Sequence, residues 1–508
     1  MLAKVSSVAL NGLEAHAVEV EVDLAAGLPM FTVVGLPDTT VRESRDRVRS
    51  ALRNTGFCFP QRRVTVNLAP ADLPKEGAGF DLPIAVGILA AEGLIPADVL
   101  RHYVMVGEVS LEGGIKPVRG VLSMALSCRG RSFKGFLVPS ENAAEAAIVE
   151  DVEVYPVATI PQVVECLTGA QAWTSVDRGA MHTLSVPPWC ADFADVRGQH
   201  HAKRALEVAA AGGHNVLLVG PPGSGKTMLA QRLSGILPSM TLDEAIESTR
   251  IHSVAGLLPG AQPLLRARPF RAPHHSISDA GLIGGGTVPR PGEISLAHNG
   301  VLFLDELPEY RRNVLEGLRQ PLEEGVIAIT RVSAALSYPA RVMLIAAMNP
   351  CPCGFLGDRA HPCVCSPVQI QRYRARVSGP LLDRLDLHVE VPAVPFRELA
   401  ADERGEASHA ILQRVVAARA KQTERYRGTQ THCNAQLHPG QIKKYCKIAV
   451  DGRTLIEQAM VRLGLSARAY VRILKVARTI ADLDGSEPIL AAHVAEAIQY
   501  RSLDRQVI

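Results

Sequence analysis

The sequence feature that most constrains the fold is a phosphate-binding loop, Gly220-Pro221-Pro222-Gly223-Ser224-Gly225-Lys226-Thr227. It has the pattern G-x-x-x-x-G-K-[ST] and lies between an apolar run (215–219), typical of a buried parallel strand, and a helical pattern that begins at Met228. The glycines allow the backbone N–H groups and the helix N-terminus to surround a phosphate. Lys226 supplies charge to the β- and γ-phosphates, and the Thr227 hydroxyl is placed to hold Mg²⁺. A chance glycine-rich turn is the alternative, but the agreement of strand, loop and helix favours binding of ATP with Mg²⁺.

Length and composition limit the remaining possibilities. The 508 residues correspond to about three domains. A hydrophobic share of 47% with 21% charged residues is typical of a soluble globular protein with a sizeable core. The formal net charge is only +3, so any nucleic-acid site would have to be a local basic patch.

The apolar runs and the cysteines indicate the compartment. No apolar run approaches the ~18 residues of a membrane-spanning helix, and Met1-Leu2-Ala3-Lys4 does not begin a signal peptide. We therefore expect a cytoplasmic protein with no membrane partner. The ten cysteines would be reduced there, so a close group of them indicates metal rather than disulfides.

Residues 1–172 have the pattern of an α+β domain. Valines alternate with acidic residues as in a half-buried strand: Val18, Val20 and Val22. Helices are predicted over residues 38–55, from Asp81 as an N-cap, and over residues 143–149. The apolar periodicity fades after this domain, and Pro187-Pro188 marks a linker over residues 173–190.

Two motifs in the first domain resemble the proteolytic domain of Lon-type proteases. They are Pro-Lys-Glu-Gly-Ala-Gly-Phe-Asp (74–81) and Gly-Glu-Val-Ser, followed by Ile-Lys-Pro-Val (107–118). That family has a serine and a lysine at the positions that hold Gly79 and Leu122 here. Without a hydroxyl and an amine within reach of each other there is no activated nucleophile. The resemblance therefore implies a Lon-protease-like domain that lacks the Ser-Lys dyad and serves assembly or substrate gripping.

A second buried strand of the central region ends in two carboxylates, Asp305 and Glu306. In this Walker B arrangement Asp305 would hold Mg²⁺ through water, and Glu306 would polarise the attacking water. An acidic turn after a strand is the alternative, which the upstream P-loop disfavours.

Four residues receive roles from a resemblance to AAA+ ATPases. Asn349 ends the apolar strand 342–348 at the position of sensor 1, which contacts the γ-phosphate. Arg384 corresponds to an arginine finger that reaches the nucleotide of a neighbouring subunit, with an intramolecular Arg–Asp pair as the alternative. Arg468 corresponds to sensor 2, and Gln199 lies in the segment that packs on adenine.

The remaining C-terminal part, residues 396–508, is predicted to be a helical lid. The helix over residues 465–483 is expected to turn one set of side chains inward: Tyr470, Ile473, Ala477 and Ile480. A second face carries an exposed basic stripe: Arg468, Arg472 and Lys475.

Two further features separate this chain from a generic ATPase. Residues 266–290 form a basic, turn-rich insertion with a flexible tip at Gly284–Gly286, suited to gripping a phosphate backbone; a solvated loop is the alternative. Four cysteines follow Asn349 closely: Cys351, Cys353, Cys363 and Cys365. This group fits a closed Zn²⁺ site, with His361 as a possible substitute ligand and plain reduced thiols as the alternative.

Several strings resemble the magnesium chelatase-like AAA+ proteins of the ComM/YifB family over nearly the whole chain. They are Arg-Pro-Phe-Arg-Ala-Pro-His-His-Ser (268–276), Pro-Gly-Glu-Ile-Ser-Leu-Ala-His (291–298) and Asn-Pro-Cys-Pro-Cys-Gly (349–354). The resemblance implies a Lon-like front domain, a P-loop AAA+ core (191–395) with a parallel sheet, and a helical lid. It also implies a hexameric ring that hydrolyses ATP, binds single-stranded and branched DNA, and drives branch migration during natural transformation. A chelatase-type motor that remodels a protein partner is the alternative, and a Lon-type protease is disfavoured by Gly79 and Leu122.

Overall fold

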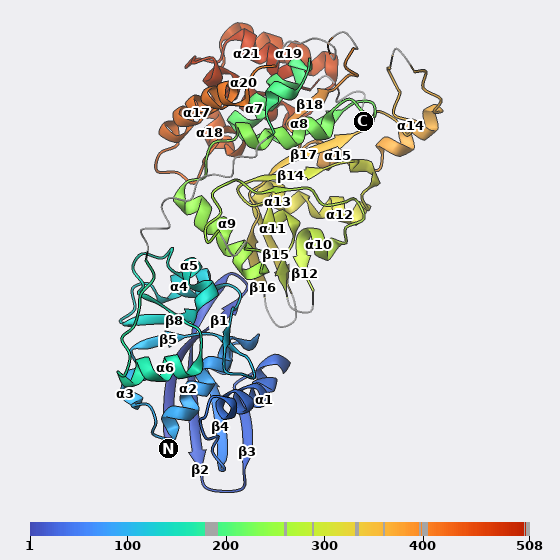
Figure 1. Ribbon diagram of the computed structural model, residues 1–508. Helices are drawn as coiled ribbons and strands as arrows, with labels where there is room; N and C mark the ends of the chain where they lie inside the picture. The colour runs from blue at the N-terminus through green and yellow to red at the C-terminus, as the bar shows by residue number, and fades with distance from the viewer. Residues whose placement is uncertain are drawn as a thin grey trace. The chain divides into compact units, whose positions relative to one another are not determined.

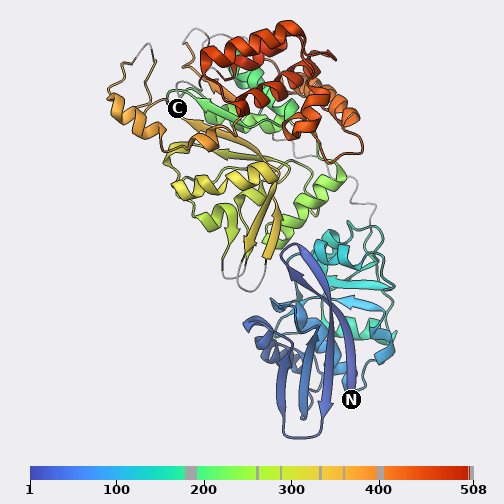
Figure 2. The same ribbon diagram turned by 180° about the vertical axis from the view of Figure 1, so that it is seen from behind.

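The computed structural model describes residues 1–177, 191–258, 262–286, 289–330, 335–358, 361–395, 398, 405–501 and 503. The chain forms two compact units. Unit 1 contains residues 1–185, 242–265 and 328–338, and unit 2 contains residues 186–241, 266–327 and 339–508. Both can be followed from opposite sides (Figures 1 and 2). The predicted Pro187-Pro188 boundary lies outside the described residues.

Unit 1 is built on a seven-stranded mixed sheet in the order β3-β4-β2-β1-β5-β8-β9. The strands have these bounds: β1 Leu2–Asn11, β2 Glu14–Ala25, β3 Met30–Val34, β4 Arg63–Ala69, β5 Tyr103–Met105, β8 Gly135–Pro139 and β9 Val154–Val157. The helices that pack with it are α1 Thr39–Asn54, α2 Asp81–Ala91, α4 Val121–Cys128, α5 Ala143–Ala146 and α6 Ile160–Thr168. The predicted alternation in β2 is confirmed, because Val18, Val20 and Val22 are buried between exposed or half-buried acidic residues.

Two local predictions in unit 1 need correction. Asp81 does not cap α2; its carboxylate is buried and accepts bonds from Arg47 Nε (2.7 Å) and Nη2 (3.0 Å). The buried ion pair therefore replaced the expected cap. The helix expected over residues 143–149 ends at Ala146, since the next residues turn toward β9.

Unit 1 also includes a helix that follows the P-loop in the sequence. Helix α9 (Leu242–Ala255) packs on α4, and the Ser253 hydroxyl donates to the buried carboxylate of Glu145. The backbone N–H of Leu122 donates to the same carboxylate at 2.8 Å. Leu122 is fully buried and Gly79 lies in a 3₁₀ turn. Neither residue has the hydroxyl or the amine that the Ser-Lys dyad of Lon proteases would require at these positions.

Unit 2 is built on a five-stranded parallel sheet in the order β11-β14-β17-β10-β18. The strands are β11 Phe270–Arg271, β14 Val301–Leu304, β17 Met343–Met348, β10 Val216–Val219 and β18 Leu387–Glu390. Strands β10, β14 and β17 are buried throughout, as expected for a parallel sheet covered on both faces. The predicted fold class is therefore confirmed for the central region: a parallel sheet with α7 (His200–Gly212) and α8 (Lys226–Arg232) beside it.

The C-terminal helices share one hydrophobic core with this sheet. They are α17 Ser408–Arg425, α18 Pro439–Tyr445, α19 Val450–Leu463, α20 Ala467–Leu483 and α21 Ala491–Gln499. Helices α17 and α20 pack on α7, as both views show. The helical lid is thus part of unit 2; the boundaries proposed at 172, 190 and 395 remain predictions.

The basic stripe predicted on α20 is wrong beyond Arg468. Arg472 is only 21% exposed and donates to the buried Asp386 at 2.5 Å, and Lys475 is buried and donates to the carbonyl of Ala435 at 2.7 Å. Tyr470, predicted to face inward, is exposed. The side chains of Arg472 and Lys475 face the interior because they have buried partners there. The periodicity of the sequence does not reveal such partners.

Asp386 is the centre of this polar contact and gives a stability prediction. Burial by itself raises the pKa of Asp386, but Arg472 and His214 lower it well below the ordinary range. Asp386→Asn is expected to cost about 3 kcal/mol of unfolding free energy, because it leaves the largely buried Arg472 guanidinium without its carboxylate partner. In the wild type this contribution is present above the unfolded-state pKa of about 4 and is lost as the pH falls below it. Denaturant titrations would measure both effects; Asp383→Asn, at a more exposed carboxylate, should change stability much less. An equal loss in the two variants would contradict the argument.

Within the described residues, none of the helices combines the length and the apolar character needed to span a membrane.

Candidate functional site: the nucleotide-binding edge of the sheet

The P-loop joins the end of β10 to the start of α8. Its path depends on glycine: a Cβ at Gly220 would lie 2.0 Å from the carbonyl oxygen of Val391, and Gly225 precedes α8 at φ +90°. Lys226 Nζ donates to the carbonyls of Gly220 and Pro221, both at 2.8 Å. Burial lowers the pKa of Lys226, whereas Asp305 and Glu306 oppose that shift. The ammonium group is therefore held across the loop with carboxylates nearby.

The P-loop residues contact the ends of two neighbouring strands. Lys226 Nζ donates to Asn349 Oδ1 at 3.2 Å, and Thr227 Oγ1 donates to Asp305 Oδ2 at 2.7 Å. This follows from the topology, because β10 and β14 flank β17 in one parallel sheet and all three end at the same edge. Thr227 and Asp305 offer the hard oxygen ligands that Mg²⁺ prefers. Residues predicted from three separate segments thus meet at one site.

Glu306 follows Asp305 in a left-handed conformation, at φ +52°. Its backbone N–H donates to Asp305 Oδ1 at 2.9 Å, and its Oε2 lies 3.3 Å from Nδ1 of His275. The hydroxyl of Tyr310 donates to the carbonyl of Pro273 at 2.5 Å, which fixes the His275 loop beside the Walker B turn. His275 belongs to the basic segment 266–290, so that segment contacts the proposed catalytic carboxylate directly.

Gln199 lies at the start of α7, also with positive φ (+54°). Its Nε2 donates to the carbonyls of Pro392 (2.6 Å) and Ser224 (3.3 Å). The side chain thus ties α7 to the P-loop and to the chain beyond β18. Its role toward adenine remains a prediction.

Arg384 lies just after α15 (Gly379–Leu382), and its side chain is only 11% exposed. It forms an ion pair with Glu323 of α13 (Arg319–Glu324) within the same chain. The intramolecular pair considered above is therefore present, with a glutamate as partner. A cavity of about 950 Å³ lies beside this segment, and three arginines help to line it: Arg312, Arg319 and Arg374.

Arg468 is 70% exposed at the start of α20, and its Nη1 lies 3.5 Å from Oδ2 of Asp383. This ion pair joins Arg468 to Asp383, the residue before Arg384. The side-chain hydrogen bonds given above for Lys226 and Thr227 go to other residues. The sensor 2 role remains a prediction.

The basic segment 266–290 is more ordered than its composition indicates. Arg271 forms a two-bond ion pair with Glu293, at 2.6 Å for each bond, and Arg268 donates to the carbonyls of Asn299 and Pro238. Gly284–Gly285 of the predicted tip form strand β12 and pair with β13 (Arg290–Pro291), and the flexibility of the tip remains a prediction. A Cβ at Gly292 would lie 2.4 Å from the backbone nitrogen of Gly284, so the hairpin requires backbone contact. His274 and Arg290 are exposed, while Arg268 and Arg271 stabilise the fold.

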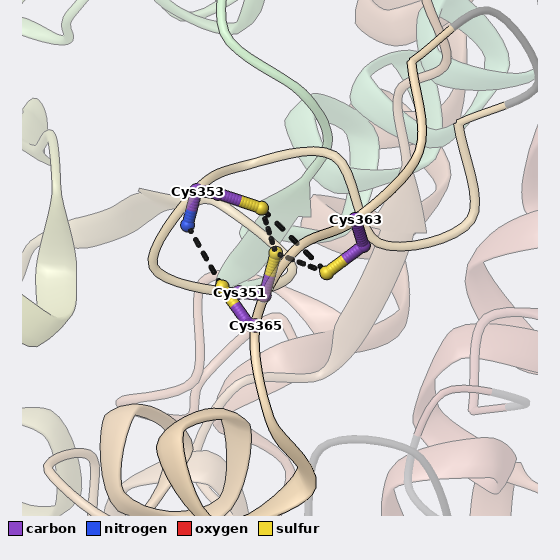
Figure 3. Close-up of side chains that lie close together, drawn as sticks. All are labelled: Cys351, Cys353, Cys363 and Cys365. Atoms are coloured by element: carbon purple, nitrogen blue, oxygen red, sulfur yellow. Dashed lines mark hydrogen bonds between the residues drawn. The ribbon is translucent and has the colours of Figure 1, made fainter.

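The four cysteines after Asn349 come together in one loop, and their side chains face one another (Figure 3). The Sγ atoms of Cys351 and Cys353 are 3.3 Å apart, and each lies 3.6 Å from Sγ of Cys363. The backbone N–H of Cys353 donates to Sγ of Cys365 at 3.4 Å. Backbone N–H groups of Phe355 and Val364 lower the pKa of the Cys353 thiol to about 6. All four thiols are free, which fits a metal site better than disulfides.

Sequence reasoning missed the residues that connect these parts. Asn215 Oδ1 accepts from the Leu344 N–H in β17 (2.8 Å), and its Nδ2 donates to the carbonyl of Arg384 (3.2 Å). Asn215 thereby links the P-loop strand, the strand β17 that ends before Asn349, and the Arg384 segment. A polar residue at the entry of an otherwise apolar strand was the available signal.

Comparisons with known proteins match the whole chain. The family "Magnesium chelatase, subunit ChlI" matches residues 192–399, "Subunit ChlI of Mg-chelatase" matches residues 20–142, and "Magnesium chelatase, subunit ChlI C-terminal" matches residues 405–501. The chain is 48% identical to competence protein ComM of Haemophilus influenzae, over 99% of this chain and 98% of that protein. It is 47% identical to YifB of Salmonella typhimurium, over 100% and 98%. A Lon protease of Rhizobium meliloti is 25% identical over 150 residues, 27% of this chain and 18% of that protein.

Proposed function

The chain belongs to the magnesium chelatase-like AAA+ family of ComM and YifB, and on this premise we propose that it is an ATP-driven motor that moves branched DNA. The observation that carries the proposal is the convergence of Lys226, Thr227, Asp305 and Asn349 at one edge of the parallel sheet. These residues supply a phosphate-binding cation, ligands for Mg²⁺ and a polar contact for the γ-phosphate. Glu306 at the same edge polarises the attacking water.

The DNA part of the proposal is supported by the relative named for competence and by the basic segment. DNA branch migration, acting on single-stranded and branched DNA, would help incoming DNA to be integrated during natural transformation. Exposed His274 and Arg290 are available for phosphate contacts, and His275 of the same segment contacts Glu306. The segment thus offers a physical route by which DNA could alter hydrolysis.

The motor is proposed to act as a ring, because an arginine finger completes the ATP site of a neighbouring subunit, and the number of six subunits follows from the resemblance to ComM alone. Arg384 would leave Glu323 to contact the neighbour's γ-phosphate, and Arg468 would act as sensor 2. The arginine-lined cavity beside residues 379–382 is positively charged, which suits a face that receives phosphates. The Lon-like front domain would serve assembly or DNA gripping. Zn²⁺ bound by the four cysteines is a further proposed cofactor.

The experiment that tests this function measures both the rate of ATP hydrolysis and the formation of branch-migrated DNA products. The purified chain would be incubated with ATP and Mg²⁺, with or without four-way-junction DNA. We expect the junction DNA to stimulate ATP hydrolysis and to be converted by branch migration into separated duplex products. A second candidate, a chelatase-type motor that remodels a protein partner, is favoured by the family matches named for ChlI. Hydrolysis that ignores branched DNA would favour that candidate.

The contact between His275 and Glu306 gives a direct prediction. Because the imidazole lies against the carboxylate that should polarise water, His275→Ala is expected to raise DNA-free ATP hydrolysis several-fold and to reduce the stimulation by DNA. Steady-state ATP hydrolysis with and without junction DNA measures both quantities. His274→Ala is the matched control for the DNA-free rate, which it should leave unchanged, since its ring bonds Ser276 and not Glu306. A fall in DNA-free hydrolysis for His275→Ala would show that the contact assists catalysis rather than restraining it.

A further inference from the structure

The four-cysteine loop has the dimensions of a cage for one metal ion. A tetrahedral Zn²⁺ with Zn–S bonds of about 2.3 Å requires its sulfurs to lie about 3.8 Å apart. Three of the Sγ–Sγ distances are 3.3, 3.6 and 3.6 Å, and all four sulfurs lie within 4.8 Å of one another. This space accommodates a single ion and is too small to enclose a cluster of several metal atoms. Four thiolates are soft ligands that select Zn²⁺ over Mg²⁺.

Backbone hydrogen bonds hold the cysteine loop in a defined turn. The Cys353 N–H points at the Cys365 sulfur, and the Gly354 N–H donates to the Cys351 carbonyl at 3.0 Å, which closes a tight turn. Ser366, directly after the last cysteine, caps helix α14 (Pro367–Arg374) with a capping box. The second half of the loop is therefore anchored to a helix, whereas the first half continues strand β17.

The same loop lies directly against the ATP site. A Cβ at Gly354 would lie 2.5 Å from Cδ and 2.7 Å from Cγ of Pro222 in the P-loop. Asn349, which accepts from Lys226, is separated from Cys351 by Pro350 alone. The guanidinium of Arg374 donates twice, at 3.2 Å, to the carbonyl of Pro350. Any movement of the cysteine turn would therefore displace both Asn349 and the contact with Pro222.

We propose that one Zn²⁺ bound by Cys351, Cys353, Cys363 and Cys365 fixes this loop and thereby holds Asn349 and Pro222 in position to bind ATP. The metal has no role in the hydrolytic step itself. When zinc is lost, the turn that contacts Pro222 loosens, and nucleotide affinity falls. The proposal rests on the proposed function only in taking the P-loop as the ATP site, and DNA plays no part in it.

Metal content tests the site. Elemental analysis of the full-length protein is expected to find about one zinc per chain and no iron. Co²⁺ substitution should give the visible absorption of tetrahedral thiolate coordination. Cys363→Ser should lose the zinc, Cys363→His should retain it as a Cys₃His site, and Cys58→Ser, at an exposed cysteine in unit 1, should leave it unchanged. No zinc in the wild type, or iron in its place, would overturn the site.

Binding of a fluorescent ATP analogue tests the link to the nucleotide, without any requirement for turnover or DNA. Cys363→Ser is expected to weaken binding at least several-fold, and Cys363→His to restore it. Gly354→Ala should also weaken binding, because a side chain is strained at φ +86° and the methyl group would press on Pro222. Equal affinity in zinc-loaded and zinc-free protein would overturn the link even if the metal is present. Failure of the DNA assay alone would leave these results unchanged, so the two proposals can be separated.

Discussion

Glu306→Gln is expected to leave ATP binding near the wild-type level and to reduce hydrolysis by about 10²- to 10⁴-fold. The amide has the size of the carboxylate but cannot accept a proton from the attacking water. Binding should persist because the phosphate and Mg²⁺ contacts come from Lys226, Thr227 and Asp305 instead. Nucleotide binding by fluorescence and phosphate release would separate the two effects.

The matched control for that experiment is Glu309→Gln. Glu309 lies three residues further along, and its carboxylate pairs with Arg376 at 2.8 Å on the surface. We expect this variant to hydrolyse ATP at nearly the wild-type rate. Unchanged hydrolysis in Glu306→Gln would remove Glu306 from the mechanism.

Arg384→Ala is expected to reduce hydrolysis by about 10³- to 10⁵-fold with little change in nucleotide affinity, as for an arginine finger supplied by a neighbouring subunit. Mixing Arg384→Ala with Lys226→Ala subunits should then restore part of the activity. In a mixed ring, an intact P-loop from one variant can face an intact Arg384 from the other. Hydrolysis rates measured across mixing ratios would show this recovery as a maximum between the two inactive extremes.

The ion pair between Arg384 and Glu323 provides a control for this experiment, and the sequence alone did not indicate that pair. If Arg384 acts only by pairing with Glu323, then Glu323→Gln should impair hydrolysis as much as Arg384→Ala does. If Arg384 acts on the neighbour's nucleotide, freeing it from Glu323 should leave hydrolysis intact or raise it. Equal losses in both variants, together with no recovery on mixing, would refute the role between subunits.

The front domain resembles Lon proteases without the two residues that their chemistry requires. Its sequence resembles Lon proteases, yet Leu122 is buried and apolar where a lysine amine would be required, and Gly79 carries no side chain. Restoring one residue of the dyad would not restore a nucleophile, because the hydroxyl and its base act together. The domain instead buries Glu145 against Ser253 of α9, a helix that follows the P-loop in the sequence. This contact suits a structural role better than a catalytic one.

The sequence by itself determined the fold class and the family, because these depend on local patterns. The P-loop, the apolar strands that end at Asp305 and Asn349, and the alternation in β2 are each visible within about ten residues. Their meeting at one edge was also predictable, since parallel strands place their carboxyl ends together. The four cysteines lie close together in the sequence, so their cluster was also predictable from a local pattern.

The tertiary structure alone decided which polar groups are paired. Arg472 and Lys475 lie on what the sequence presents as an exposed face, but they are turned inward toward Asp386 and the Ala435 carbonyl. His275 and Glu306 are separated by about thirty residues, and Gly354 by far more from Pro222, yet each pair is in close contact. Such contacts depend on how distant segments pack, because a buried charge must find its partner wherever the chain brings one. Periodicity records only whether a residue is apolar, and so it cannot name that partner.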